Sequence, residues 1–234
     1  MTNSMPKVTL SMIVRNEANR HLRQALTNHR QFIDQAVIID DGSNDHTVAM
    51  CKEVLHDIPL KLICNPHSTF HHEVDLRKQQ WQETIATNPE WILNLDADEW
   101  FENNDGHALK LFLQSTSSDA IYFRLFDMWN NTHYRDDHYW RAHHLYRPFL
   151  VRYKPNIDYI WKESDQHSGR FPLSISDFPY HLHQLRIQHF GWAREADRQT
   201  KFQRYMELDG DGKDGWLEQY HSILDATPNL IPFD

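Results

Sequence analysis

The sequence has 234 residues and a mass of 28.0 kDa, with 40% apolar and 24% charged residues. This length supplies one sizeable domain with its own core, and this composition excludes a chain that is disordered throughout. Acidic residues outnumber basic ones by 33 to 24, and the net charge of −9 argues against sequence-independent binding to nucleic acid. The sequence has neither an apolar run of about 18 residues nor a signal peptide at its start, so we expect a cytoplasmic protein without a transmembrane segment.

The first hundred residues alternate between predicted strands and predicted helices. Short β-branched or apolar runs predict strands at 8–14, 36–40, 60–64 and 90–96. Apolar residues at helical spacing predict helices from Ala18 to Ile33, from Val48 to Leu55 and from Val74 to Ile85. Strands separated by helices pair in parallel through right-handed crossovers. We therefore predict a Rossmann-like α/β half with an open sheet covered on both faces.

The rest of the chain has a different pattern. Strands are predicted at 119–129, 143–153 and 182–190 with few helices between them, which is consistent with antiparallel extension of the sheet. A helix is predicted from Ala193 to Leu208, and the last ten residues, with two prolines, are expected to form an ordered or frayed tail. No linker, repeat or low-complexity stretch interrupts the sequence, so we expect one domain.

Polar residues follow three of the predicted parallel strands. They are Arg15, Asn16 and Glu17 after the first, Asp40 and Asp41 after the second, and Asp96, Asp98 and Glu99 after the fourth. In open parallel sheets, ligands bind outside the carboxyl ends of the strands. Each motif alone could be structural, because Asp-Gly-Ser is a good turn and Asn can cap a helix. Together they predict an acidic crevice.

The Asp96-Ala97-Asp98 segment places two carboxylates on the same side of an extended chain. Such close like charges repel one another unless a cation or a hydroxyl donor lies between them. Mg²⁺ or Mn²⁺, bound by one or two carboxylates and by phosphate oxygens of a substrate, would be a suitable cation. The segment therefore predicts a metal-assisted diphosphate site.

Three segments resemble, in their order and spacing, the motifs of the inverting, nucleotide-sugar-dependent glycosyltransferases of family 2, which have the GT-A fold. These segments are SMIVRNEA at 11–18, AVIIDDGSNDHT at 36–47 and WILNLDADEW at 91–100. HLYRPFLVR, LRIQHFGW and DRQTKFQRYMELD also resemble the C-terminal half of compact bacterial members. The resemblance implies one GT-A domain over 1–234, with a nucleotide-binding half at 1–100 and an acceptor-binding half at 101–234.

The resemblance also implies a donor site for a nucleotide diphosphate sugar, with UDP as the expected nucleotide. The nucleobase would be held by Asp41, which would accept a hydrogen bond from the imide of uracil, and by Val14, Arg15, Asn16 and Glu17. Asp96 would face the ribose, with Ala97 in the same donor-binding segment.

Further residues are implied near the diphosphate. Asp98 would bind the Mg²⁺ or Mn²⁺ ion, and His189 matches a late histidine that often completes the metal site, although an isolated histidine on a strand can also be a core residue. Arg77 matches a basic position that contacts the donor, but Glu73 four residues earlier could equally pair with it along a helix. Arg194, Arg198, Lys201 and Arg204 form a basic stripe that is either solvated or reaches the diphosphate.

The catalytic base is less clearly marked. Inverting transfer needs a carboxylate, or less often a histidine, to take the proton of the acceptor hydroxyl. The expected stretch of the sequence lacks the Glu-Asp or His-Glu pair that many family members carry, and its candidates are Asp165, which we favour, Glu163 and His167. A solvated loop is the structural alternative for all three.

Three functions follow from these motifs. The first is a glycosyltransferase whose acceptor is a saccharide, a lipid-linked molecule or a protein, compatible with peripheral membrane contact. The second is a catalytically weak module that binds nucleotide sugars. The third is a nucleotidyltransferase, which is disfavoured because MIVRNEANR lacks the glycines of a phosphate-binding loop.

Overall fold

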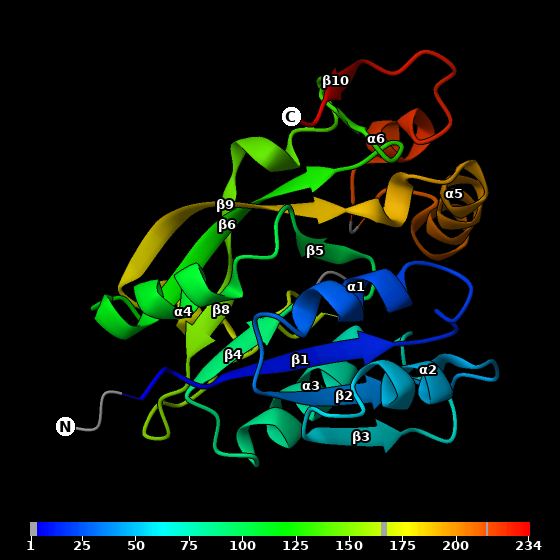
Figure 1. Cartoon of the computed structure of the whole chain (residues 1–234). Helices are drawn as coiled ribbons and strands as arrows, with labels where there is room; N and C mark the ends of the chain where they lie inside the picture. Colours follow the sequence, from blue (N-terminus) through cyan, green and yellow to red (C-terminus); the bar gives the residue numbers. More distant parts are fainter. Residues whose placement is uncertain (1–3, 165–167, 214) are drawn as a thin grey trace.

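The computed structural model describes residues 4–164, 168–213 and 215–234. Its centre is a mixed eight-stranded sheet in the order β3-β2-β1-β4-β8-β6-β9-β5 (Figure 1). The parallel part consists of β1 (Val8–Val14), β2 (Gln35–Asp40), β3 (Leu60–Cys64) and β4 (Trp91–Asn94). The other part consists of β8 (Tyr146–Arg152), β6 (Ala120–Asp127), β9 (Tyr180–His189) and β5 (Glu99–Phe101).

The expected strand–helix alternation of the first half is observed. Between its strands lie α1 (Leu22–His29), α2 (Thr47–Val54) and α3 (Glu73–Ile85). The later helices are α4 (Gly106–Ser115), α5 (Glu195–Asp209) and α6 (Leu217–Ser222), with 3-10 turns η1 (Ala142–His144), η2 (Leu173–Asp177) and η3 (Phe190–Trp192).

Side-chain alternation along the strands explains why helices cover both faces of the sheet. On β1, Leu10 and Met12 pack into the core cluster that also holds residues of α1, α2 and α4. The intervening Ser11 points to the opposite face, where its hydroxyl is hydrogen-bonded to that of Thr84 on α3 at 2.8 Å. The Trp81 ring on α3 belongs to a second core cluster, so the sheet is buried on both faces as expected for a parallel sheet.

The second half contains elements that the sequence pattern did not indicate. β5 and α4 follow directly after the Asp96–Asp98 segment, and the side chain of Asp105 caps α4 by accepting a hydrogen bond from the Ala108 N–H at 2.9 Å. The C-terminal tail is ordered, because β10 (Leu230–Pro232) pairs antiparallel with β7 (His133–Arg135).

Strand direction in the second half differs in one respect from simple antiparallel extension. β8 is antiparallel to both β4 and β6, as expected, but β6 and β9 pair in parallel with each other. As a result β6 and β9 run in the same direction as β1, β2 and β4. The arrowheads of these strands point to the side of the molecule where α5 lies (Figure 1). Because β3 is parallel to β2, six carboxyl ends therefore lie at one edge of the sheet.

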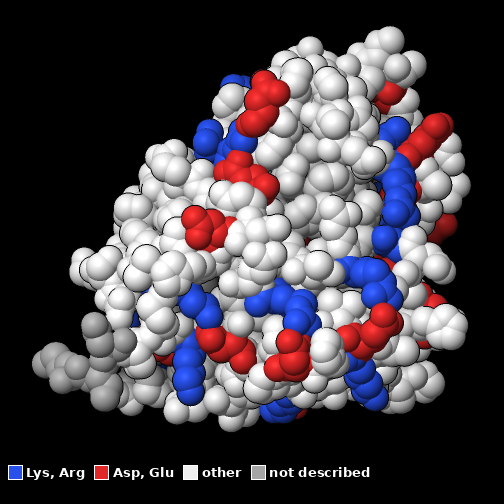
Figure 2. Space-filling model, viewed as in Figure 1, with Lys and Arg blue, Asp and Glu red and all other residues white. Residues whose placement is uncertain are grey.

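The surface near α1 and α2 carries paired charges. Arg23 and Glu53 lie 2.9 Å apart, and Arg30 and Asp57 lie 2.6 Å apart. Figure 2 shows lysine and arginine side chains next to aspartate and glutamate side chains on this face. Among the described helices, none has both the length and the apolar character that crossing a bilayer requires.

Candidate active site

A cavity of about 390 Å³ lies at the edge of the sheet where the carboxyl ends of the parallel strands lie. Residues after β1, β2 and β4 line it together, as the sequence pattern predicts; they are Val14, Arg15, Glu17, Asp41, Asp96, Ala97 and Asp98. The lining also includes Arg77 from α3, His189 at the end of β9, and Lys201 and Arg204 from α5. We call this space the first cavity.

Asp41 is fully buried at one end of the first cavity. One of its carboxylate oxygens accepts hydrogen bonds from the Ser68 hydroxyl at 2.6 Å, and the other accepts from the Thr69 N–H at 2.9 Å. The Arg15 guanidinium donates to the same Ser68 hydroxyl at 2.7 Å. Gly42 next in the chain has a φ of +73° and lies against the backbone of His67 and Ser68, which brings the two loops together.

The loop after β1 is attached to the loop after β2 by Asn16. This residue has a positive φ of 52°, its N–H donates to the Ser43 hydroxyl at 2.9 Å, and its side-chain oxygen accepts from the Asn44 N–H at 2.9 Å. Asn16 does not belong to the residues that line the first cavity, so in this structure it shapes the loop from outside.

Glu17 lies on the same loop and lines the cavity. Its backbone N–H donates to the Thr47 hydroxyl at 2.7 Å, and its carboxylate pairs with Arg20 at 2.9 Å. Burial raises the pKa of Glu17 to about 7, against the opposing effect of Arg20 and with a further rise from Asp98. The Glu17 carboxyl is thus partly protonated near neutral pH.

Asp96 lies between two arginines. Its carboxylate oxygens lie 3.5 Å from the guanidinium of Arg77 and 3.5 Å from that of Arg170. Burial disfavours ionisation, but Arg170 and Arg77 outweigh it and lower the pKa of Asp96. Arg77 also lies 3.3 Å from Glu73, so the helical pair and the contact with the strand-end carboxylate exist at the same time.

Asp98 and His189 lie next to each other in the lining of the cavity. Oδ2 of Asp98 lies 3.7 Å from Nε2 of His189 and 3.7 Å from Nζ of Lys201. Burial alone would raise the pKa of Asp98, but the charges of His189 and Lys201 hold it well below its usual range. Burial likewise opposes protonation of His189, yet Asp98 and Asp127 raise the pKa of His189 to about 10.

Asp127 is the last residue of β6 and fixes the orientation of the His189 ring. Its Oδ1 lies 2.8 Å from Nδ1 of His189, which directs Nε2 towards Asp98. Histidines that bind metals commonly donate their other ring N–H to a carboxylate in this way. The parallel pairing of β6 with β9 places Asp127 directly opposite His189.

Gly191 keeps the space between these groups open. A Cβ built at this position would lie closest to Nζ of Lys201, 2.5 Å from Oδ2 of Asp98 and 2.6 Å from Nε2 of His189. A carboxylate and an imidazole that converge on one such space, with a second carboxylate behind the imidazole, suit a divalent cation. Asp98 and His189 are therefore the residues that could hold Mg²⁺ or Mn²⁺.

A second cavity of about 330 Å³ adjoins the first and shares Asp96, His189, Trp192 and Tyr205 with it. The rest of its lining includes aromatic and charged residues, among them Trp140, Tyr220, Asp127, Arg147 and Arg170. Flat aromatic faces next to charged groups are suited to a polar ligand with apolar patches. A group bound here would lie beside Asp96 and His189.

The basic stripe on α5 divides into two pairs. Lys201 and Arg204 line the first cavity. Arg194 instead donates to the backbone oxygen of Asn19, and Arg198 donates to that of Trp192. Only half of the stripe is therefore directed to the site.

The three candidates for the catalytic base lie within residues 165–167, which the structure does not describe, or close to them. Asp165 and His167 are outside the described residues. Glu163 is exposed and pairs with Lys78 on α3 at 2.7 Å. It does not line either of the two cavities. Its role stays a prediction.

Three residues of the site were not expected from the sequence, namely Asp127, Arg170 and Gly191. Arg170 donates two hydrogen bonds to the buried Glu99 at 2.8 and 2.9 Å and also lies beside Asp96. The rule that ligands lie at carboxyl ends of strands would have found Asp127, had it been applied to the strand at 119–129 as well. Nothing in the sequence near Arg170 or Gly191 indicates their contacts.

Comparison with solved structures gives the fold class. A chain of S. aureus TarS superimposes with a TM-score of 0.59 at 13% identity, covering 93% of this chain and 42% of that one. A structure of TarS residues 1–349 in complex with UDP-GlcNAc gives a TM-score of 0.54 at 14% identity, with coverages of 93% and 70%. These similarities confirm the expected GT-A-like fold class.

Sequence relatives give the family. An uncharacterized glycosyltransferase of Rickettsia felis is 30% identical over 95 residues, which are 41% of this chain and 30% of that protein. An uncharacterized protein of Mycobacterium tuberculosis is 26% identical over 220 residues, which are 86% of this chain and 51% of that protein. The chain thus spans at most about half the length of either relative. The model of glycosyl transferase family 2 matches residues 9–168, well over half of the sequence, and the chain therefore belongs to that family.

Proposed function

We propose that the chain is an inverting glycosyltransferase that moves a sugar from a UDP-sugar to an acceptor hydroxyl with the help of Mg²⁺ or Mn²⁺. The observation that carries this proposal is the first cavity, whose lining contains Asp41 and Asp98 together with the cationic side chains of Arg77, Lys201 and Arg204. The complexes of TarS with UDP and with UDP-GlcNAc support a nucleotide-sugar donor for a chain of this fold and family.

At the nucleobase end, Asp41 would receive the imide N–H of uracil. The hydrogen bonds from Ser68 and Thr69 fix the orientation of the Asp41 carboxylate before the donor arrives. Oδ1 also accepts from the Thr69 hydroxyl at 3.3 Å, whereas Oδ2, which accepts from Ser68, has a second lone pair for a further hydrogen bond. Val14, Arg15 and Glu17 line the same cavity, and Asn16 would contribute by holding the loop.

Asp96 would bind the ribose, with Ala97 forming part of the wall. Because Arg170 and Arg77 lower the pKa of Asp96, its carboxylate is ionised at neutral pH and can accept hydrogen bonds from ribose hydroxyls. Arg77 is held by Glu73 and Asp96 and would add positive charge near the donor.

Asp98 and His189 would hold the metal ion, which when bound would neutralise the negative charge of the departing diphosphate. Asp127 keeps Nε2 of His189 directed towards Asp98, and Gly191 leaves the space between them free. Lys201 and Arg204 on α5 would supply additional positive charge to the diphosphate. These groups stabilise the leaving group by position and charge, without forming a covalent bond to it.

The acceptor would occupy the second cavity. It adjoins the first at Asp96 and His189, and Trp140, Trp192 and Tyr205 offer aromatic faces on which sugar rings can stack. The base would take the proton of the acceptor hydroxyl as that hydroxyl attacks the anomeric carbon from the side opposite the diphosphate. We retain Asp165 as the preferred base, with Glu163 and His167 as alternatives.

The division into halves is also part of the proposal. Residues 1–100 would bind the nucleotide and residues 101–234 would bind the acceptor, within a single domain. His189, Lys201 and Arg204 come from the second half but line the first cavity, so the second half would also complete the diphosphate site.

The direct experiment is the substitution Asp98→Asn. Transfer and donor hydrolysis, measured over a panel of UDP-sugars with Mn²⁺, should fall by at least about 100-fold because one charge of the metal site is lost. Circular dichroism should show an unchanged fold, because Asp98 lies at the cavity wall. Asp75→Asn removes an exposed carboxylate on α3 and serves as the matched control. Full activity of folded Asp98→Asn would refute the proposed metal site.

The base is tested separately with Asp165→Asn, Glu163→Gln and His167→Gln. Loss of the base should abolish transfer while leaving the dissociation constant of the UDP-sugar unchanged, since the base contacts the acceptor only. If the wild-type chain binds UDP-sugars but neither transfers nor hydrolyses them, the alternative of a sugar-nucleotide-binding module is favoured.

A further inference from the structure

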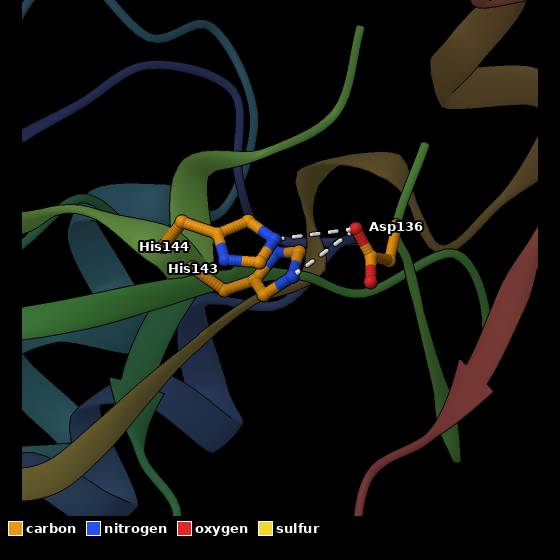
Figure 3. Close-up of side chains that lie close together, drawn as sticks. All are labelled: Asp136, His143 and His144. Atoms are coloured by element: carbon orange, nitrogen blue, oxygen red, sulfur yellow. Dashed lines mark hydrogen bonds and ion pairs between the residues drawn. The ribbon is translucent and has the colours of Figure 1, made fainter. Parts of the chain in front are cut away.

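Asp136, His143 and His144 form a cluster that none of the proposed steps uses. Asp136 follows β7, and the two histidines belong to η1. Figure 3 shows both imidazole rings directed at the same carboxylate oxygen of Asp136. Nε2 of each ring lies 3.4 Å from that oxygen, and the three candidate ligand atoms all lie within 4.8 Å of one another.

His144 is hydrogen-bonded to Asp136 at 3.4 Å, and both carboxylate-to-imidazole separations also have the length that a shared metal ion would impose. An N–H···O hydrogen bond usually spans about 2.7–3.2 Å, which is shorter than the observed separations. Two ligands bound to Zn²⁺ at about 2.0–2.1 Å in a tetrahedral arrangement lie about 3.3–3.4 Å apart. An octahedral Mg²⁺ site with similar bond lengths brings its adjacent ligands to about 3.0 Å. The carboxylate-to-imidazole distances therefore match a tetrahedral ion.

His143 provides an independent indication. The residue is buried, with 6% of its surface exposed, and among the described residues its Nε2 has no hydrogen-bond partner, the Asp136 oxygen at 3.4 Å being its nearest polar contact in the cluster. The ring lies between aromatic neighbours, with centroid distances of 5.4 Å to Phe126 and 4.8 Å to Tyr134. A buried polar atom without a hydrogen bond costs about 1–3 kcal/mol. Coordination of an ion at Nε2 would remove this cost.

The chemistry of the three groups selects the class of ion. Two imidazoles and one carboxylate suit Zn²⁺ and related transition metals, whereas Mg²⁺ and Ca²⁺ prefer oxygen ligands only. His144 is half exposed, which leaves the cluster open to an ion and to water from solvent.

We propose that Asp136, His143 and His144 bind one Zn²⁺ ion, with water as the fourth ligand, at a site distinct from that of Asp98 and His189. The ion would serve a structural purpose. Asp136 exchanges backbone and side-chain hydrogen bonds with Asn229, which leads into β10, so coordination would join the β7–β10 sheet to η1. Ala142 of η1 lines the second cavity, and the ion would thereby stiffen one wall of that cavity.

The test is a calorimetric titration of the metal-stripped chain, without a histidine tag, with ZnCl₂. The expected result is one tight Zn²⁺ per chain and a higher melting temperature in the presence of Zn²⁺. Substituting Co²⁺ should produce the intense visible absorption of four-coordinate cobalt. Asp98→Asn should retain this ion, which separates the site from the proposed catalytic metal and keeps the outcome independent of the proposed function.

The variants His144→Ala and Asp136→Asn identify the ligands. Each should weaken Zn²⁺ binding by at least about 10- to 100-fold and abolish the rise in melting temperature. Both positions are partly exposed, so these variants should fold, whereas His143→Ala also removes buried packing. His56→Ala removes an exposed histidine outside the cluster and is the matched control. The proposal is overturned if the wild-type chain binds no Zn²⁺, or if both variants bind it like the control.

Discussion

Gly191→Ala is the sharpest test of how the space between Asp98 and His189 is used. The added methyl group would lie 2.5 Å from Oδ2 of Asp98 and 2.6 Å from Nε2 of His189, well inside normal contact distance, and closest of all to Nζ of Lys201. Lys201 can swing away because its side chain is flexible. The His189 ring is held by Asp127, so the Asp98–His189 pair must open instead.

The effect on stability should be moderate. At 3.7 Å and an effective dielectric constant of about 20, the attraction between Asp98 and protonated His189 is about 4.5 kcal/mol, and opening the pair by about 1 Å lowers it by about 1 kcal/mol. Adding a methyl group to a well-packed site typically costs about 1–3 kcal/mol. Gly191 does not have a positive φ, so alanine adds no backbone strain. The variant should therefore fold with a slightly lower melting temperature.

The effect on metal binding should be large. The methyl group would fill the space that an ion needs, so the affinity for Mn²⁺ should fall by at least about 100-fold, with a similar fall in kcat/KM for the donor. Calorimetry or electron paramagnetic resonance would measure Mn²⁺ binding, and donor hydrolysis would measure turnover. Lys201→Ala is the control for the Mn²⁺ measurement only, because it removes the displaced ammonium without blocking the space but also removes a charge proposed to face the diphosphate. If Gly191→Ala binds Mn²⁺ and turns over donor within about twofold of wild type, the reasoning is refuted.

Three further predictions follow from the same region and from the core. Asp127→Asn should weaken Mn²⁺ binding by about 10- to 100-fold because His189 loses its orienting carboxylate, and unchanged affinity in calorimetry would contradict that role. Arg170→Leu leaves the buried Glu99 unpaired and should lower the free energy of unfolding in urea by about 3–5 kcal/mol, whereas Arg170→Leu combined with Glu99→Leu should recover most of this loss. Burial lowers the pKa of His29 from 6.5 to about 3. Between these two pH values the unfolded chain binds a proton at His29 that the folded chain does not bind. The stability that neutral His29 contributes is therefore complete above about pH 6.5 and decreases as the pH falls towards 3. Unfolding free energies of wild type and His29→Gln should diverge over that interval by up to about 1.4 kcal/mol per pH unit, and parallel curves would rule out the assignment.

The first half of the fold could be predicted because its signals are local. Each strand of the parallel sheet is a short apolar run, and each is followed by polar residues whose convergence needs only the rule for parallel sheets. The shared lining of the first cavity by Asp41 and Asp98 follows from that rule. Their chemical roles stay predictions.

The rest depends on contacts between distant segments. Asp127 and His189 are 62 residues apart and meet only because β6 and β9 pair in parallel, a choice that the strand sequences do not encode individually. β10 pairs with β7 across nearly the whole second half and contains Pro232, which disfavours a strand in a sequence-based prediction. The Asp136–His143–His144 cluster likewise requires the turn that brings η1 back beside β7.

The parallel pairing of β6 and β9 also affects how this chain can be recombined with its relatives. Asp98 comes from one half of the sequence, while the imidazole and the ammonium that face it come from the other. A chimera joined near residue 100 would combine a carboxylate from one parent with cationic partners from a second. Exchanging the donor-binding half between relatives should therefore preserve activity only when β9, η3 and α5 are transferred together with the first hundred residues.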